Sequence, residues 1–136
     1  MKYTLSFLCL LMFTLGCYSS SGPDLISVQG NVVYQGTPVK EGVVKFIPAQ
    51  GVKAPARTAS VVDGNYELEG RFGLMPGTYN VKIEGYEGED VPLSDPTQKV
   101  TPRRQILPAK YNRKSEIQPV TVSLEEKWLN QDFQLD

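Results

Sequence analysis

Apolar and polar residues alternate in short runs along the chain, and the two clearest runs are residues 65–68 and 78–83. A period of two residues is typical of a β-strand with one face buried in a core. The turn dipeptide Asp63-Gly64 stands directly before the first run, and a Pro-Gly dipeptide stands close before the second. We therefore expect two strands with a common core. The apolar face of these strands contains Tyr66, Leu68, Tyr79, Val81 and Ile83.

Similar alternation predicts strands in five further segments. These segments are residues 25–34, 43–47, 58–62, 117–124 and 133–135. Gly30 interrupts the first of them, and a glycine inside a strand marks a bulge or the close approach of another backbone. Glycine and proline separate the segments, and none has the apolar period of an amphipathic helix. We therefore expect an all-β fold, an antiparallel β-sandwich of about seven strands.

Other segments do not follow the alternation. Phe72 and Met75 lie in an apolar connection, and we expect them to cover one end of the core as a hydrophobic lid. Residues 86–116 contain four prolines, and a connection of this length is either a functional loop or an extended segment along the sheet edge. Within it, residues 106–107 are a candidate edge strand. Residues 125–130 are expected to form a turn or a single helical turn.

Charge and composition exclude several classes of function for this chain of 136 residues. The formal net charge is −1 and no basic stripe is present, so we expect no nucleic-acid partner. Histidine is absent, which excludes Ser-His-Asp triads, Cys-His dyads and histidine-ligated zinc. The two cysteines are Cys9 and Cys17, so residues 25–136 have neither a disulfide nor a thiolate metal site. We expect no cofactor and no metal.

The N-terminal residues 1–16 have the features of a signal peptide, because a positive residue precedes an apolar run that is too short to span a membrane. The run ends in the letters TLGC, which resemble the lipobox of bacterial lipoproteins. Thr14 stands where that motif has an aliphatic residue, whereas the last three positions match. The resemblance implies cleavage before Cys17 and acylation of its sulfur. An ordinary secretory signal with an incidental cysteine is the alternative.

The boundaries that follow are a lipidated cysteine with a flexible tether in residues 17–24 and a β-sandwich domain in residues 25–136. Several acyl chains at one site give stable anchoring, where a single chain gives only marginal binding. We expect an exported, membrane-anchored lipoprotein that faces the periplasm or the cell surface.

The order of the motifs resembles that of carboxypeptidase regulatory-like domains. Residues 28–39, VQGNVVYQGTPV, match the opening pattern V-x-G-x-V-x-x-x-G-x-P-V of that family. Residues 63–68, DGNYEL, and 76–81, PGTYNV, match its next two motifs. Residues 107–122 are similar to the ending of small exported lipoproteins of planctomycete-type bacteria. The resemblance implies a transthyretin-like (prealbumin-like) β-sandwich, in a family of which most members have no assigned ligand or activity.

Three aromatic residues are the candidate contacts for a ligand or partner: Tyr86, Tyr111 and Trp128. They lie in segments that we expect to be loops, where aromatic faces stack on sugars or bind proteins. Alternatively, Trp128 caps the core and Tyr111 anchors the long loop. Residues 84–95 also contain five acidic residues, but their spacing does not match an EF-hand calcium loop, and such loops are usually solvated.

Together these features predict a non-enzymatic, lipid-anchored module of the cell envelope with a structural or protein-interaction role. The alternative is a carbohydrate- or peptide-binding module that uses the loop of residues 86–116. The expected partners are the membrane, through the lipid on Cys17, and an envelope protein or polysaccharide. The hydroxyisourate hydrolases resemble transthyretin but use histidines, so their activity is not expected here.

Overall fold

The structure is a computed structural model that describes residues 22–88 and 103–136. Within these ranges it contains ten β-strands, one 3-10 helix and one short α-helix. The strands are β1 (Ser27–Tyr34), β2 (Thr37–Pro38), β3 (Glu41–Pro48), β4 (Arg57–Val62), β5 (Asn65–Leu68), β6 (Gly77–Glu87), β7 (Arg104–Gln105), β8 (Val120–Val122), β9 (Trp128–Asn130) and β10 (Phe133–Leu135). The helices are η1 (Gly70–Phe72) and α1 (Ala109–Asn112).

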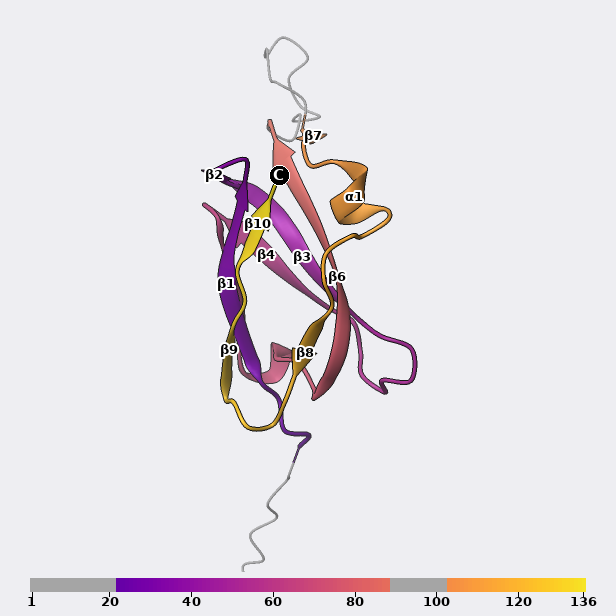
Figure 1. Ribbon diagram of the computed structural model, residues 1–136. Helices are drawn as coiled ribbons and strands as arrows, with labels where there is room; N and C mark the ends of the chain where they lie inside the picture. Colours follow the sequence, from indigo (N-terminus) through magenta and orange to yellow (C-terminus); the bar gives the residue numbers. More distant parts are fainter. Residues whose placement is uncertain (1–21, 89–102) are drawn as a thin grey trace, which may run out of the picture.

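The strands form one curled sheet in the order β10-β1-β5-β4-β3-β6-β7 (Figure 1). Two further strands, β2 and β9, pair with β1, and β8 pairs with β6. The curl brings β1 and β6 to opposite sides of one core, which confirms the predicted all-β, sandwich-like fold. The pairings of β1 with β9 and with β10 are parallel, and the other pairings between these strands are antiparallel.

The core is formed by the alternate residues that the sequence pattern selects. On β6, the side chains of Tyr79, Val81 and Ile83 are fully buried, and the buried Val44 and Phe46 of the neighbouring strand β3 pair with Ile83 and Val81. The predicted apolar face of β5 is buried as well. Each buried side chain of this size contributes about 1.5–3 kcal/mol relative to an exposed one. The two halves of the curled sheet are therefore held together by one continuous apolar layer.

Two tight turns support the strand register. The turn at Asp63-Gly64 joins β4 to β5, with φ angles of 48° and 80°. A second turn, Gln35-Gly36, joins β1 to β2, with φ angles of 49° and 77°. Positive φ at both central residues is the geometry of two-residue hairpins, because its twist matches that of the flanking strands. The predicted turn before β5 is thus confirmed.

Gly30 lies where a second backbone crosses β1, which is one of the two interpretations that a glycine inside a strand allows. A Cβ atom at residue 30 would lie 1.9 Å from the carbonyl oxygen of Gln131, so only glycine fits. The backbone N–H of Gln131 donates to the Gln29 carbonyl at 2.8 Å, and the buried Tyr66 hydroxyl donates to the Gln131 carbonyl at 2.6 Å. Burial, with a smaller effect of the nearby Asp132 carboxylate, raises the pKa of Tyr66, so the hydroxyl stays a donor.

The structure differs from the sequence prediction in three segments. Trp128–Asn130 is a strand rather than part of a turn or helical turn, because it pairs with the backbone of β1 over residues 27–29. The edge strand lies at Arg104–Gln105 and not at residues 106–107. Phe72 is 53% exposed and does not cover the core, whereas Leu74 beside it is fully buried.

The molecule has two distinct ends (Figure 1). The chain enters β1 at the end that also contains the turn between β8 and β9, and we name this the tether end. At the opposite end lie β2, β7, α1 and the C-terminus. In the part of the chain that the structure describes, no helix is long and apolar enough to cross a membrane.

Candidate functional site

The three aromatic residues proposed as contacts do not come together. Tyr86 lies on β6 rather than in a loop, and its side chain is half-buried. Tyr111 belongs to α1 and is buried. Trp128 lies on β9 at the tether end and is 43% exposed. Cys17 and residues 89–102 of the long connection lie outside the described residues.

Tyr111 connects α1 to the end of the chain. Its hydroxyl donates to the carbonyl oxygen of Asp136 at 2.9 Å and accepts from the N–H of the same residue at 2.8 Å. The Lys110 ammonium lies 4.9 Å from the centre of the Tyr111 ring. Contact between the two side chains raises the pKa of Lys110. Because the Tyr111 hydroxyl both donates and accepts a hydrogen bond within the protein, Tyr111 has a structural role in this arrangement.

The outer face of β3 and β6 contains a paired group of polar side chains, which we name the paired face. Lys45 Nζ donates to Glu84 Oε1 at 2.7 Å, and the Tyr86 hydroxyl donates to Glu84 Oε2. Both hydrogen bonds lower the pKa of Glu84, and the bond from Lys45 has the larger effect. Partial burial raises the pKa and offsets part of this shift. The bond to Glu84 raises the pKa of Tyr86. Glu84 is therefore held as an anion between two donors.

Two arginines extend the paired face toward β7. Arg103 lies 2.7 Å from Glu41 and 4.5 Å from the centre of the Tyr86 ring, and Arg104 lies 3.3 Å from Glu87. Among the described residues, no group of three or more acidic, cysteine or histidine side chains could hold a metal ion. Of the five acidic residues between positions 84 and 95, Glu84 and Glu87 bind basic partners, and the rest lie outside the described residues.

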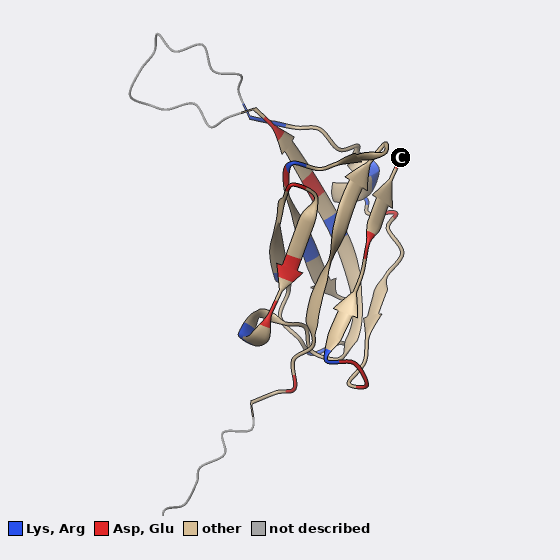
Figure 2. Ribbon diagram, turned by 90° about the vertical axis from the view of Figure 1, so that its left-hand side faces the viewer, with Lys and Arg blue, Asp and Glu red and all other residues tan. Residues whose placement is uncertain are grey.

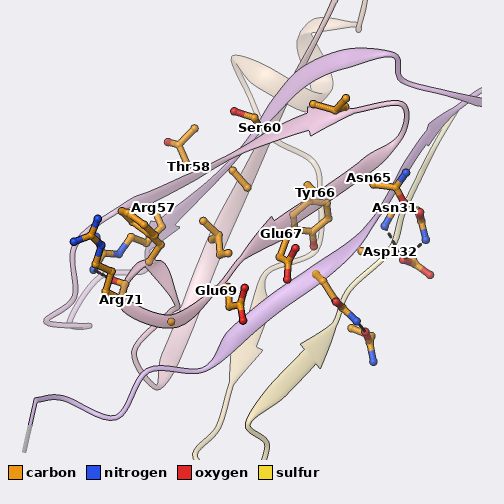
Figure 3. Close-up of a pocket in the computed structure, with 18 of the residues that line it drawn as sticks. Asn31, Arg57, Thr58, Ser60, Asn65, Tyr66, Glu67, Glu69, Arg71 and Asp132 are labelled. Atoms are coloured by element: carbon orange, nitrogen blue, oxygen red, sulfur yellow. Dashed lines mark hydrogen bonds between the residues drawn. The ribbon is translucent and has the colours of Figure 1, made fainter.

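A large concave surface lies on the other outer face, over β1, β5 and β4 (Figure 3). It is an open hollow of about 1330 Å³, which we name the polar hollow. Its floor consists of the side chains that alternate with the core residues of these strands. They are Gln29 and Asn31 of β1, Thr58 and Ser60 of β4, and Asn65 and Glu67 of β5.

One rim of the polar hollow contains both charge and an aromatic ring. The Arg71 guanidinium lies 4.8 Å from the centre of the exposed Phe72 ring. Arg57 Nη2 donates weakly to the Arg71 carbonyl, at 3.5 Å. Arg57 Nε is buried and has no hydrogen-bond partner in the described part of the chain. Figure 3 shows both arginines at one side of the hollow, with Glu69 between this rim and the floor.

The opposite rim is formed where residues 130–132 cross β1. Asp132 Oδ1 accepts from the Asn31 backbone N–H at 2.8 Å, and Gln29 Nε2 donates to Asn130 Oδ1 at 2.7 Å. This rim depends on the absence of a side chain at Gly30. Figure 2 views this side of the molecule and shows acidic and basic residues interspersed rather than gathered in a patch of one sign.

The floor between the rims has unused hydrogen-bonding capacity. Thr58, Ser60 and Glu67 make no side-chain hydrogen bond to any of residues 22–88 and 103–136. Their hydroxyl and carboxylate groups are exposed within the hollow. Hydroxyls donate and accept, and an ionised carboxylate accepts at two oxygens. The surface is thus suited to a ligand rich in hydroxyl or amide groups.

The polar hollow could not be predicted from the sequence, because its residues come from β1, β4, β5 and residues 130–132, which are separate parts of the chain. The signal was present in part, since Thr58, Ser60 and Glu67 lie in two segments that the sequence pattern predicts as strands. The missing information was the strand order, in which β5 lies between β1 and β4. The rim residue Asp132 joins them only through the parallel crossing over Gly30.

Comparisons with known proteins gave no match: no family model, no curated protein and no solved structure is similar to this chain.

Proposed function

We propose that this protein is a non-enzymatic, lipid-anchored binding module of the cell envelope, and that it binds an extended polysaccharide in the polar hollow. The observation that carries the proposal is the floor of unpaired hydroxyl and carboxylate groups, Thr58, Ser60 and Glu67, between two polar rims. This location replaces the loop of residues 86–116 as the expected binding surface.

The chemistry of the hollow favours a carbohydrate ligand. Sugar hydroxyls both donate and accept, so they match a floor in which hydroxyls, amides and a carboxylate stand side by side. The exposed ring of Phe72 at the rim offers an apolar face for a sugar ring. Pockets for small molecules usually enclose about 300–1,000 Å³ and bury most of the ligand. The hollow is larger and open, which favours a segment of a polymer.

The arrangement of the carboxylates supports binding rather than catalysis. Glu67 and Glu69 stand two residues apart along one strand and its extension, beside each other in Figure 3. The Asp132 carboxylate on the opposite rim accepts hydrogen bonds from the backbone and side chain of Asn31 and helps to hold that rim. Glycoside hydrolysis needs two carboxyl groups on opposite sides of the scissile bond. The chain also lacks histidine, the commonest general base near neutral pH.

The anchoring part of the proposal rests on Cys17 and its resemblance to a lipobox cysteine. Acylation after cleavage would leave residues 17–24 as the link to the domain. The test is the intact mass of the mature chain purified from membranes. We expect a chain that begins at Cys17 and carries acyl chains, and a Cys17→Ser variant that leaves the membrane fraction. An unacylated wild-type chain would disprove the anchor.

Binding is tested with the full chain in detergent micelles, by calorimetry against peptidoglycan fragments and against soluble β-linked hexasaccharides. We expect a Glu67→Ala and Thr58→Ala double variant to bind at least about tenfold more weakly, which corresponds to 1.4 kcal/mol. Each lost hydrogen bond to a charged group is worth about 1.5–3 kcal/mol. Asn80→Ala is the matched control, since Asn80 is an exposed strand residue on the outer face of β6. Equal losses in both variants, or no glycan binding, would contradict the proposal.

A further inference from the structure

The described part of the chain exposes four large apolar side chains: Val62, Phe72, Leu124 and Trp128. Their exposed fractions are 62%, 53%, 60% and 43%. Single exposed apolar residues are ordinary, but several at one end of a small domain indicate a contact surface. Three of the four lie at the tether end, and we name Phe72, Leu124 and Trp128 the tether patch.

The fold brings the tether patch to the point where the chain enters the domain. Trp128 pairs with Ser27, the first residue of β1, and the Ser27 N–H donates to the Lys127 carbonyl at 3.0 Å. Leu124 belongs to the turn between β8 and β9, which Figure 1 shows beside the entering chain.

Phe72 reaches the same end through Leu74. Ile26, directly before β1, exchanges two backbone hydrogen bonds of 2.8 Å with Leu74. Phe72 ends the short helix η1, two residues before Leu74. All three side chains of the tether patch are thus attached to elements that contact residues 26–27.

The link between the domain and the proposed anchor is short. Eight residues, 18–25, lie between Cys17 and Ile26, where pairing with Leu74 begins, and a fully extended chain spans at most roughly 32 Å over that length. A link of this size holds the tether end close to the lipid surface at a high effective concentration. Weak apolar contacts are then sufficient to keep the two surfaces together.

The charges around the tether patch are mixed. Arg71 directly precedes Phe72, and Glu125, Glu126 and Lys127 lie between Leu124 and Trp128. Figure 2 shows both acidic and basic colours at its lower end. We therefore do not expect electrostatic attraction to anionic lipids to hold this surface on a membrane. Tryptophan prefers the boundary between lipid headgroups and water, because its ring is apolar and its N–H is polar.

We propose that the tether end rests on the bilayer, with Trp128 and Leu124 in the headgroup layer and Phe72 at its border. The inference rests on the proposed lipid anchor at Cys17. In this orientation the polar hollow, which extends from Phe72 toward Asn65, faces sideways into the envelope rather than toward the lipid. The domain then presents its binding surface to polymers that lie along the membrane.

The chain provides its own probe, because Trp128 is its sole tryptophan. The full acylated chain is reconstituted into phosphatidylcholine–phosphatidylethanolamine vesicles, with or without lipids that carry a nitroxide quencher on the headgroup. We expect Trp128 emission to shift to the blue relative to the Cys17→Ser chain in solution, and to lose intensity with labelled lipid. Leu124→Ser should reduce both effects, and Val62→Ser, which removes an apolar side chain at the opposite end, should leave them unchanged.

The outcomes separate this inference from the function on which it rests. An intact mass without acyl chains disproves the anchor and this orientation together. An acylated chain whose Trp128 emission is not quenched by labelled lipid disproves the orientation alone. A blue shift that grows with protein density in the vesicles, but not with labelled lipid, shows that a second copy covers the tether patch and also disproves the orientation. Circular dichroism of each variant verifies that the fold is retained.

Discussion

On the outer face of β3 and β6, Glu84 accepts hydrogen bonds from Lys45 and Tyr86. On the outer face of β5, Glu67 makes no side-chain bond to any residue that the structure describes. Both glutamates project outward from strands whose alternate residues form the same core. The difference lies in their neighbours, since basic and hydroxyl groups flank Glu84, whereas the neutral polar side chain of Gln29 stands opposite Glu67.

The comparison teaches that polar composition alone does not identify a binding surface. The paired face satisfies its charges internally, so a ligand there would have to displace bonds that already exist. In the polar hollow, the hydroxyl and carboxylate groups are exposed to solvent. A ligand there would replace water as their hydrogen-bonding partner. Three substitutions test this distinction by their effects on stability.

The largest effect is expected from Gly30→Val, which removes the rim of the polar hollow without touching the paired face. The new side chain would overlap the Gln131 carbonyl, so residues 130–132 would have to leave β1. We expect the free energy of unfolding, measured by urea denaturation, to fall by about 3 kcal/mol or more. Gly22→Ala is the control, because no atom lies within 4 Å of its Cβ position. Wild-type stability of Gly30→Val would show that the crossing is not required.

An intermediate effect is expected from Glu84→Gln on the paired face. Loss of the charge weakens the bonds from Lys45 and Tyr86, and we expect the free energy of unfolding to fall by about 1 kcal/mol at neutral pH. The measurement is urea denaturation of the wild type and the variant in parallel.

The pH dependence of this effect has a defined sign. The pKa of Glu84 is lower in the folded chain than its ordinary value of 4.5. Its contribution is therefore complete above pH 4.5 and is lost as the pH falls through the lower folded value. The stability curves of wild type and Glu84→Gln should converge in acid. A constant difference down to the acid transition would contradict the role of the ionised carboxylate.

The smallest effect is expected from Glu67→Gln in the polar hollow. Because Glu67 has no partner among the described residues, we expect a change in the free energy of unfolding of less than about 0.5 kcal/mol. The measurement is urea denaturation of the wild type and the variant in parallel at neutral pH. A loss as large as that of Glu84→Gln would mean that the two faces do not differ.

The sequence pattern was sufficient for much of the fold because most strands have one buried face. Alternation located the core residues of β5 and β6, Asp63-Gly64 located a turn, and Gly30 located the backbone crossing. Alternation and turn residues are local features. The backbone crossing restricts one position to glycine, and the glycine is visible in the sequence.

The remaining features depend on contacts between distant segments. Trp128–Asn130 has little strand pattern of its own and becomes a strand because β1 offers an unpaired edge. Leu124 continues the alternation of β8 but lies beyond the strand, in a turn, and is exposed. The partners of Glu84 and the rims of the polar hollow follow from strand order, which period-two alternation does not determine.

The parallel pairing of β9 with β1 also affects how the chain is made. Gln29 and Asn130, which are partners in this pairing, are 101 residues apart in sequence. At about 5–20 residues per second, synthesis leaves β1 without this partner for roughly 5–20 s. During that interval the edge of β1 is open to strands of other chains, which is a route to aggregation. The segment that covers this edge of β1 is therefore synthesised long after β1 itself, and a truncation that removes β9 and β10 would leave the edge open.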